Sequence, residues 1–347
     1  MNGAHDRAGF ALPAVLVVVA MLALVFLVAV TALDTLAEQT LRAKQRVGFE
    51  QAALSLEARA ALFAATEPLS EAALTIGGPR AVSDPGLDTT QRMRPQDILP
   101  LHLDGRLYRA GAARDPLSVS LQDAAGQLNL NLMPEVARGR LAAALGAPPA
   151  ELGGLADRWG DWLDADDLKR LNGAEAADYA AAGKTLARNG PMPRVTEILG
   201  LLGWSAVPRD GWVRLRDILA VDPHSGDFNV NTASPEALRV LFGLSEPQLR
   251  TVLEARRIAP FRSMTEFTVR TGPLPSDAEA SYTRPNGRFL LKIASPARNL
   301  VFRSRIVLTP MSPERPLWIE ERSISTASER ERTRAPADAP AFPDPAR

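Results

Sequence analysis

The chain of 347 residues carries 40 Lys and Arg against 40 Asp and Glu, so its formal net charge at pH 7 is zero. That balance gives no overall attraction to nucleic acid. The absence of Cys excludes disulfides and thiolate chemistry, and three His leave little for a zinc site or a serine–histidine nucleophile. The sequence also lacks paired carboxylates, a phosphate-binding loop and a nucleophile arrangement, so we expect no enzyme.

The first predicted element is an uncharged apolar run over residues 10–33, which follows a leader of residues 1–9. At about 1.5 Å per residue, a helix of this length crosses a bilayer core of about 30 Å. The run is longer than the apolar part of a signal peptide, and no small-residue cleavage site follows it. Arg7 precedes the run, whereas Asp34 and Glu38 follow it. This bias favours a cytoplasmic N-terminus, a single pass through the inner membrane and a periplasmic folded part.

The leader ends in Gly9, directly before Phe10 and the apolar run. A short leader with a basic residue that ends in Gly before Phe resembles the prepilin peptidase site of type IV pilins and type II secretion pseudopilins. The resemblance implies cleavage after Gly9 and N-methylation of Phe10. Pro13 fits, because in the first helical turn its missing N–H breaks no helical bond. Ala14 departs from the pattern, since most of these proteins carry Glu there, and a plain membrane anchor fits this stretch equally well.

The helix is predicted to continue through residues 34–65, which lack Pro and are rich in Ala, Leu, Glu, Arg and Gln. Apolar residues at three- and four-residue spacing form a stripe, which we expect to pack on a soluble domain. A break at Gly48, followed by a separate short helix, is the alternative. The predicted stripe consists of Leu54, Ala58, Ala61, Leu62 and Ala65.

Strands are predicted on both sides of a long helical region. Residues 66–126 are expected to form loops and strands that end in a turn at 123–126, and residues 276–327 an antiparallel meander. The last segment, residues 328–347, is charged and rich in Pro, so we expect it to be disordered. The predicted strands span residues 106–110, 117–121, 288–293, 300–308 and 316–324.

The helical region, residues 127–275, contains a degenerate internal duplication. L-N-L-N at 128–131 and F-N-V-N at 228–231 each precede a helix start that contains Pro-Glu. Each of these helices is predicted to end just before a Gly, Gly146 in the first copy and Gly243 in the second. Each copy closes with a Pro-containing turn and an acidic, apolar helix. Two copies of different length are a duplication and not a solenoid.

The second copy resembles a helix-hairpin-helix, a unit that brings the backbone N–H groups of a Gly-apolar-Gly turn to DNA phosphates. The turn here is Gly243-Leu244-Ser245, so the second Gly and its close backbone approach are lost. The first copy is acidic, and phosphate contacts supply most nucleic-acid affinity. We therefore expect no nucleic-acid partner. A membrane-anchored DNA receptor of the competence type is the alternative function.

Carboxylates cluster in the first copy of the duplication. Hard cations such as calcium bind clustered carboxylate and carbonyl oxygens, although the spacing is not that of an EF-hand. A solvated loop whose carboxylates cap helices is the alternative, and the residues alone favour it. The candidate calcium ligands are Asp164, Asp166, Asp167, Glu175 and Asp178.

Several motifs, in this order and spacing, together resemble the K-class minor pseudopilins of the type II secretion system (the GspK family). The resemblance covers about residues 7–310, and in this class the missing Glu at Ala14 is normal. The motifs are the Gly9-Phe10 site followed by SVSLQDAAGQLNLN, WGDWLDADD, GAEAADY, NGPMPRVTEILGLLGW, FNVNTASPEALRVLFG and PFRSMTEF.

The resemblance implies an α+β fold: a long N-terminal transmembrane and amphipathic helix packed on a small antiparallel sheet, with a large inserted helical domain that contains helix-hairpin-helix-like repeats. It also implies calcium, bound by some members, for which only residues 164–167 and 175–178 offer a match. The implied partners are the I-class and J-class minor pseudopilins, the major pseudopilin, the prepilin peptidase and the inner-membrane secretion platform. The implied role is at the tip of the periplasmic pseudopilus. After this role and the DNA receptor, a generic anchored adaptor is the third candidate function.

Overall fold

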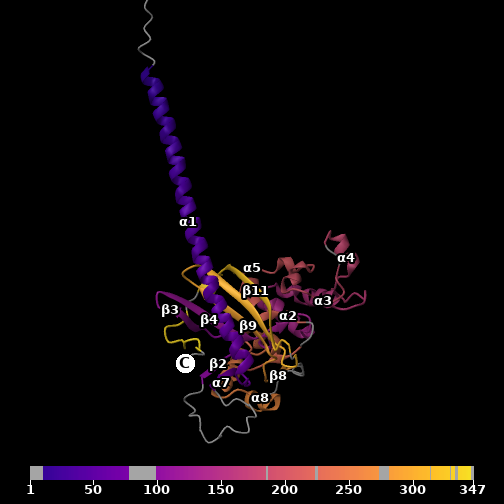
Figure 1. Cartoon of the computed structure of the whole chain (residues 1–347). Helices are drawn as coiled ribbons and strands as arrows, with labels where there is room; N and C mark the ends of the chain where they lie inside the picture. Colours follow the sequence, from indigo (N-terminus) through magenta and orange to yellow (C-terminus); the bar gives the residue numbers. More distant parts are fainter. Residues whose placement is uncertain are drawn as a thin grey trace, which may run out of the picture. The chain divides into compact units, whose positions relative to one another are not determined.

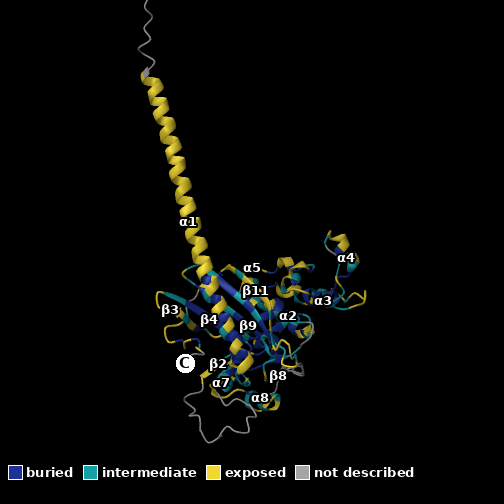
Figure 2. Ribbon diagram, in the orientation of Figure 1, coloured by how far each residue is buried: buried dark blue, intermediate teal, exposed yellow. Residues whose placement is uncertain are grey.

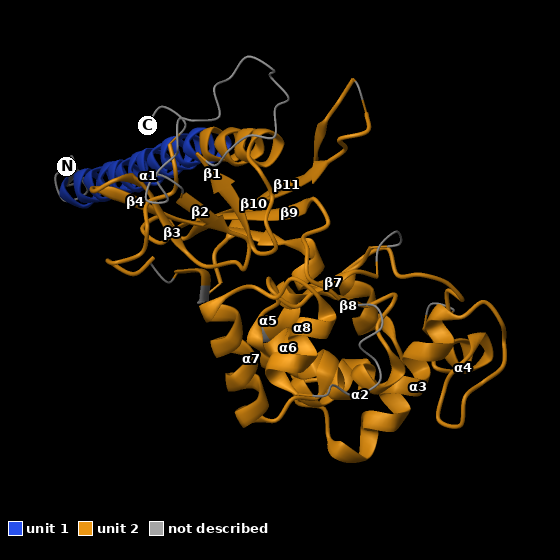
Figure 3. Ribbon diagram, turned by 90° about the horizontal axis from the view of Figure 1, so that it is seen from below, with its two compact units in different colours: residues 1–54 blue, residues 55–347 orange. Residues whose placement is uncertain are grey.

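The computed structural model divides the chain into two compact units, residues 1–54 and residues 55–347 (Figure 3). The expected cleavage site, Gly9 and Phe10, lies outside the part of the chain that the structure describes. The described residues are 11–77, 99–184, 187–222, 226–272, 281–312, 314–328, 330–332 and 335–344.

Helix α1 spans Ala11–Thr66 as one uninterrupted helix of 56 residues (Figure 1). Among the described helices it is the one that is long and apolar enough to cross a membrane, with a mean hydropathy of 3.1 over an 18-residue window. The side chains of this apolar part are exposed (Figure 2), as a surface that faces lipid requires. The single long helix is confirmed, and the alternative break at Gly48 is wrong.

The last turns of α1, within the second unit, bury a different face from the predicted stripe. Leu62 is 45% exposed, whereas Leu56, Ala60 and Phe63 are buried. This face also holds Glu57, whose carboxylate is 3% exposed and accepts hydrogen bonds from the side chains of two residues of the sheet. Ala61 is the one member of the predicted stripe that is buried. An ionised Glu is normally exposed, so the sequence pattern did not identify the face that contains Glu57. The partners of Glu57 are Ser304 and Arg322, the latter with an ion-pair distance of 2.6 Å.

A five-stranded antiparallel sheet forms the centre of the second unit, in the order β11-β10-β9-β4-β3. The meander predicted at its C-terminal side is confirmed, because consecutive strands β9, β10 and β11 pair antiparallel with a register shift between Arg305 and Ile306. On β10, Ser304 points to Glu57 of α1, while Arg303 and Arg305 line a cavity on the other side. The strands are β3 (Tyr108–Ala112), β4 (Asp115–Asp123), β9 (Arg288–Ser295), β10 (Leu300–Leu308) and β11 (Leu317–Thr326).

The helical domain is inserted between two neighbouring strands of this sheet. Strand β4 pairs with β9, with Ser118 opposite Ala294, although most of the helical domain separates them in sequence. A separate antiparallel pair, β1 (Ala73–Ile76) and β2 (Leu99–His102), follows α1. The expected α+β architecture is therefore present: a long helix, an antiparallel sheet and an inserted helical domain (Figure 1).

The inserted helices share one hydrophobic core that runs through both copies of the duplication. Trp159 and Trp204 form its centre in the first copy, with their rings edge to face and 5.5 Å apart. The first predicted closing helix, after Pro193, is only a 3-10 segment, Val195–Gly200. The helices are α2 (Glu135–Ala144), α3 (Leu152–Leu163), α4 (Ala176–Ala181), α5 (Arg209–Leu215), α6 (Pro235–Phe242), α7 (Glu246–Ile258) and α8 (Met264–Thr271).

The C-terminal segment corrects the prediction of disorder from residue 328 onward. Residues Arg330–Arg332 form a 3-10 turn, and Phe342 is 5% exposed. The composition of the segment predicted disorder because it offers few apolar groups. One Phe and one Glu of this segment nevertheless find an aromatic site and a basic site on the sheet, and these contacts order it.

Candidate functional site

Two asparagines at the start of the first copy of the duplication connect it, through hydrogen bonds, to a segment further along the same copy. The amide N–H of Asn131 donates to Oδ1 of Asn129 at 3.1 Å and closes a tight turn. The Asn131 side chain then exchanges two bonds with the backbone of Met192, which follows a Pro. Its Nδ2 donates to the Met192 carbonyl at 3.0 Å, and its Oδ1 accepts from the Met192 amide at 2.7 Å.

The second copy repeats this arrangement with Asn229, Asn231 and Phe261. The Asn231 amide donates to Oδ1 of Asn229 at 2.9 Å, and the Asn231 side chain exchanges two bonds of 2.8 Å with the Phe261 backbone. Phe261 also follows a Pro, as Met192 does. The internal duplication predicted from the sequence is thus confirmed by equivalent hydrogen bonds, although the span between the bonded residues differs.

Replacing Asn231 by Ala is expected to lower the free energy of unfolding by about 3 kcal/mol, because Asn231 is 2% exposed and its loss leaves both backbone groups of Phe261 buried without these partners. Asn131→Ala is the matched variant in the first copy, where the side chain is partly exposed, and a smaller loss is expected. Urea unfolding followed by circular dichroism measures both. Equal, near-zero losses would show that the paired bonds do not hold the copies together.

Each copy also contains a short parallel strand pair. β5 (Leu128–Asn129) pairs with β6 (Leu219–Ala220), and β7 (Phe228–Asn229) pairs with β8 (Ser281–Tyr282). The Asn motif is therefore the end of a strand in both copies. Such two-residue pairs add little stability alone.

Asp123, at the end of β4, joins the sheet to the helical domain. The side chain is fully buried, and its Oδ2 accepts from Asn229 Nδ2 at 3.0 Å and from Thr232 Oγ1 at 2.9 Å. Its Oδ1 accepts from the amides of Ala125 and Asn286 at 3.2 and 3.4 Å. Burial raises the pKa of the Asp123 carboxyl, and the bonds from Asn229 and Thr232 oppose that rise. The predicted turn at 123–126 is therefore the structural junction of the two parts.

The turn of the helix-hairpin-helix-like unit is not open to a phosphate. Gly243 ends α6 with φ 64°, and the guanidinium of Arg140 lies over it, where it would be 2.9 Å from a Cβ at that position. Arg140 also donates to the Leu241 carbonyl at 2.8 Å. Glu246 opens α7 and pairs with Arg239 at 2.6 Å. The turn is therefore covered by the Arg140 side chain and lies beside an ion pair.

The acidic loop of the first copy is organised around Asp161 and Arg170. Asp161 is fully buried at the end of α3 and accepts from the Ala174 amide at 2.8 Å. The Arg170 guanidinium lies between two carboxylates, 2.7 Å from Asp161 Oδ1 and 2.5 Å from Asp164 Oδ2. Gly173 is required here, because a Cβ at this position would lie 1.8 Å from Asp161 Oδ2. The Arg170 guanidinium thus supplies a positive charge among the carboxylates of this loop.

Glu175 forms a capping box with Asp178 at the start of α4, but it differs from its neighbours because neither carboxylate oxygen has a hydrogen bond of normal geometry although the residue is 7% exposed. Oδ1 of Asp164 is likewise buried without a partner. Burial, together with the negative charges of Asp161, Asp164 and Asp167, raises the pKa of Glu175 from 4.5 to about 7. Unsatisfied carboxylate oxygens at one place are a chemical reason for a bound cation.

The other three candidate ligands are engaged in local hydrogen bonds. Asp166 Oδ1 accepts from the Leu168 amide at 2.8 Å, and Asp167 Oδ1 accepts from Asn189 Nδ2 at 3.0 Å. Asp178 accepts from the Lys169 ammonium and, at 2.9 Å, from the Glu175 amide at the start of α4. Of these three residues, Asp178 caps a helix, as the alternative interpretation predicted, whereas Asp166 and Asp167 bond within and across the loop. Within the described part of the chain, no three His, Asp or Glu side chains converge as a ready-made metal site.

Two family models match the chain, both described as "Type II secretion system (T2SS), protein K". The first covers residues 119–223 and the second residues 228–281. The boundary between them falls directly before the F-N-V-N motif, so each match corresponds to one copy of the duplication.

Curated relatives agree with these matches. "Type II secretion system protein K" of Pseudomonas aeruginosa is 32% identical over 163 residues, which are 44% of this chain and 48% of the relative. The protein of the same name from Klebsiella pneumoniae is 32% identical over 131 residues, 37% of this chain and 39% of the relative. The alignments therefore span about half the length of the relatives, or less.

A solved structure resembles this fold. One chain of the crystal structure of the GspK-GspI-GspJ complex from the enterotoxigenic Escherichia coli type 2 secretion system aligns with a TM-score of 0.56 and 16% identity. The alignment covers 82% of this chain and 100% of that chain. This chain therefore shares the fold of that chain, with a long helix, an antiparallel sheet and an inserted helical domain. The matched regions, residues 119–223 and 228–281, are similar to type II secretion system protein K.

Proposed function

We propose that this chain is a non-enzymatic minor pseudopilin of the type II secretion system. It joins the I-class and J-class minor pseudopilins in a complex at the tip of the periplasmic pseudopilus, primes its assembly and supports export of folded proteins across the outer membrane. The observation that carries this proposal is the pair of family matches over the duplicated helical domain, inserted in a sheet that follows an apolar helix.

The apolar part of α1 holds the chain in the inner membrane, with the N-terminus cytoplasmic and the folded part periplasmic. Prepilin peptidase cleaves after Gly9, and the new N-terminal Phe10 is methylated. The charge bias around the apolar run and the Gly9-Phe10 sequence support this sequence of events. The inner-membrane secretion platform and the major pseudopilin then receive the processed subunit.

Ala14 suits a subunit with no neighbour above it. In a pseudopilus, a Glu at this position pairs with the N-terminal amine of a neighbouring subunit, and without such a pair a carboxylate in the membrane costs about 2.5–3.5 kcal/mol. A subunit at the tip lacks that neighbour, so an apolar side chain is favoured. The large inserted domain also leaves little room for further copies stacked on top of it.

Co-purification tests the proposed complex. When the full chain is produced with the I-class and J-class pseudopilins of the same organism, we expect it to elute with both in detergent. Ala14→Glu is expected to leave this co-purification unchanged, because the carboxylate is merely unneeded at the tip. A chain that elutes alone at micromolar concentration would contradict the proposed complex, and loss of assembly in the variant would show that the apolar residue is itself required.

The acidic loop is proposed to bind calcium through Asp164 and Glu175, with Asp166 and Asp167 beside them. The unpartnered oxygens of Asp164 and Glu175 fit the ion, whereas Asp178 Oδ1 pairs with Lys169 and its Oδ2 caps α4. Bound calcium would supply positive charge where the loop holds buried carboxylates. It would hold the loop closed and take no part in a reaction.

Without calcium, the stability of the chain is expected to fall as pH rises from 4.5 through about 7, because Glu175 has a raised pKa in the folded state and must ionise while buried. Glu175→Gln is expected to remove this pH dependence and also the thermal stabilisation by calcium at pH 8. Thermal unfolding in EDTA and in calcium measures both effects. The exposed Glu151→Gln is the control, and a calcium response that survives in Glu175→Gln would rule out this ligand.

A further inference from the structure

The two edge strands of the sheet are protected in different ways. Strand β11 is largely exposed and carries the charges of Glu320, Glu321 and Arg322, which discourage pairing with another strand. Strand β3 has the sequence YRAGA with one charged residue, so its own side chains protect it poorly. The C-terminal segment of the chain lies along this second edge.

Backbone hydrogen bonds hold the segment against β3. Ala341 lies parallel to Arg109 in an isolated bridge. The Arg109 amide donates to the Pro340 carbonyl at 2.9 Å, and the Phe342 amide donates to the Arg109 carbonyl at 2.7 Å. The Arg109 side chain also donates, at 2.7 Å, to the carbonyl of Ala339. The segment therefore follows the edge as an added strand would, over a few residues.

Phe342 is the apolar anchor of this segment. Its ring packs edge to face on Tyr108 of β3, at 6.1 Å between centroids, and tilted on Phe63 of α1, at 6.4 Å. The Arg59 guanidinium lies 5.5 Å from the ring centroid and donates to the Phe342 carbonyl at 3.3 Å. With Phe342 5% exposed, the groove between the end of α1 and β3 is filled by this ring.

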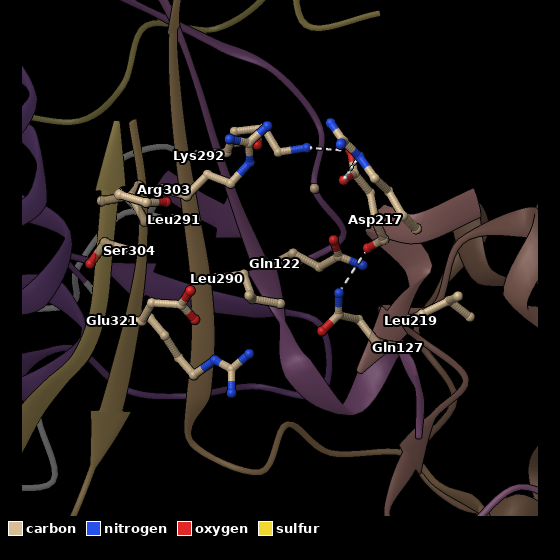
Figure 4. A pocket seen from close by; sticks show the side chains of 15 residues that line it. Gln122, Gln127, Asp217, Leu219, Leu290, Leu291, Lys292, Arg303, Ser304 and Glu321 are labelled. Carbon is tan, nitrogen blue, oxygen red and sulfur yellow. Dashed lines mark hydrogen bonds and ion pairs between the residues drawn. The ribbon is translucent and has the colours of Figure 1, made fainter. Parts of the chain in front are cut away.

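Glu331 is a second, electrostatic anchor. It is 7% exposed and pairs with three basic groups, Arg303, Lys292 at 3.6 Å and Arg216 at 3.8 Å. Burial opposes its ionisation, but hydrogen bonds from Ser328 and the charges of Arg303 and Lys292 lower its pKa to about 2. The same basic residues line one end of a cavity of about 230 Å³ between the sheet and the helical domain (Figure 4).

We propose that the described residues of the C-terminal segment, 328, 330–332 and 335–344, form a strap and that the groove beside β3 is a binding site for an extended peptide with an Ala-Phe-Pro sequence. The strap is the built-in occupant of this groove. It closes the β3 edge against strand addition and joins the end of α1 to the sheet, because Phe342 contacts both. This inference rests on the contacts of the strap and is independent of the secretion function.

Peptide binding tests the groove. The probe is a fluorescent peptide of residues 335–344, titrated into the full chain and into a chain that ends at Arg332, both in detergent micelles. The shortened chain is expected to bind the peptide at least about tenfold more tightly than the full chain, whose own strap fills the groove. The same peptide with Ala in place of Phe should not bind. Equal binding to both chains, or equal binding of both peptides, would overturn the proposal.

A second measurement remains informative if the shortened chain misfolds. In the otherwise intact chain, Phe342→Ala should release the strap, so trypsin should cleave after Arg332 and Arg334 at least about tenfold faster than in the unmodified chain. Exchange of the Arg109 amide should accelerate in parallel. The exposed Asp338→Asn serves as the control and should change neither rate. Unchanged cleavage in Phe342→Ala would show that Phe342 does not hold the strap.

Discussion

Replacing Asp123 by Ala is expected to lower the free energy of unfolding by about 4 kcal/mol. The side chain is fully buried and accepts four hydrogen bonds, two of them from the side chains of Asn229 and Thr232 in the second copy. Ala removes every acceptor. Asn229 Nδ2 keeps the Glu71 carbonyl at 3.3 Å and Thr232 Oγ1 keeps the Asn229 carbonyl at 3.5 Å, but four bonds to one buried carboxylate are lost, and each group left unsatisfied costs about 1–3 kcal/mol. Because Asp123 is the last residue of β4, the substitution weakens the junction between the sheet and the helical domain.

Urea unfolding followed by Trp fluorescence measures this effect, because Trp159, Trp162, Trp204 and Trp212 all lie in the helical domain. Asp123→Asn keeps the shape but places an amide nitrogen against donors, so a loss of about 2 kcal/mol is expected. The exposed Asp210→Ala is the control, with an expected change within about 0.5 kcal/mol. A loss below about 1 kcal/mol in Asp123→Ala would contradict the assigned role.

Replacing Trp204 by Ala is expected to cost about 4–5 kcal/mol and to unfold the first copy before the second. Trp204 is fully buried, stacks edge to face on Trp159 at 5.5 Å and donates its indole N–H to the Leu155 carbonyl at 3.2 Å. The Ala variant creates a large cavity and leaves that carbonyl without the indole N–H. A compact core cannot collapse fully around such a loss.

Trp318→Ala is the matched control for this variant. Trp318 lies on the exposed edge strand β11, is 43% exposed and has the Arg315 guanidinium 4.7 Å from its ring centroid. Removing an exposed cation–π contact should cost no more than about 1 kcal/mol. Thermal unfolding by circular dichroism compares the two variants directly. Similar losses in both would contradict the placement of Trp204 at the centre of the core.

The sequence was sufficient for features that depend on local periodicity. The apolar run and the helix-forming residues after it predicted α1, and residues 300–308 were predicted as the strand that is β10. Repetition of the two Asn motifs predicted the duplication. Their role was missed, because the partners Met192 and Phe261 lie 61 and 30 residues further along the chain. A Pro before each partner is the one local signal that could have found them.

Long-range charge contacts account for the errors. Glu57 appeared to exclude its face of α1 from the core, yet it is buried by Ser304 and Arg322, which follow it in sequence by 247 and 265 residues. Glu331 and Phe342 appeared to belong to a disordered tail, yet they fill a basic site and an aromatic groove formed by residues that are distant in sequence. Composition alone does not predict which distant residues become the partners of such groups.

The same limit applies to the acidic loop. The local spacing of the carboxylates was compatible with helix capping and with cation binding. In the structure, Asp178 caps a helix. It leaves Glu175 and Asp164 with unpartnered oxygens, which is the arrangement on which the calcium proposal depends. The sequence neighbours of Glu175 did not predict its burial. One of the charges that raise its pKa, that of Asp161, belongs to the preceding helix, α3.

The mass of the N-terminus tests the central claim most directly. The chain should be isolated from the membranes of its own cells and its N-terminal peptide analysed by mass spectrometry. A processed pseudopilin is expected to begin with N-methylated Phe10, whereas a plain anchored adaptor or a DNA receptor of the competence type would not be cleaved after Gly9. A mature chain that retains Met1 and residues 1–9 would contradict the assignment as a pseudopilin.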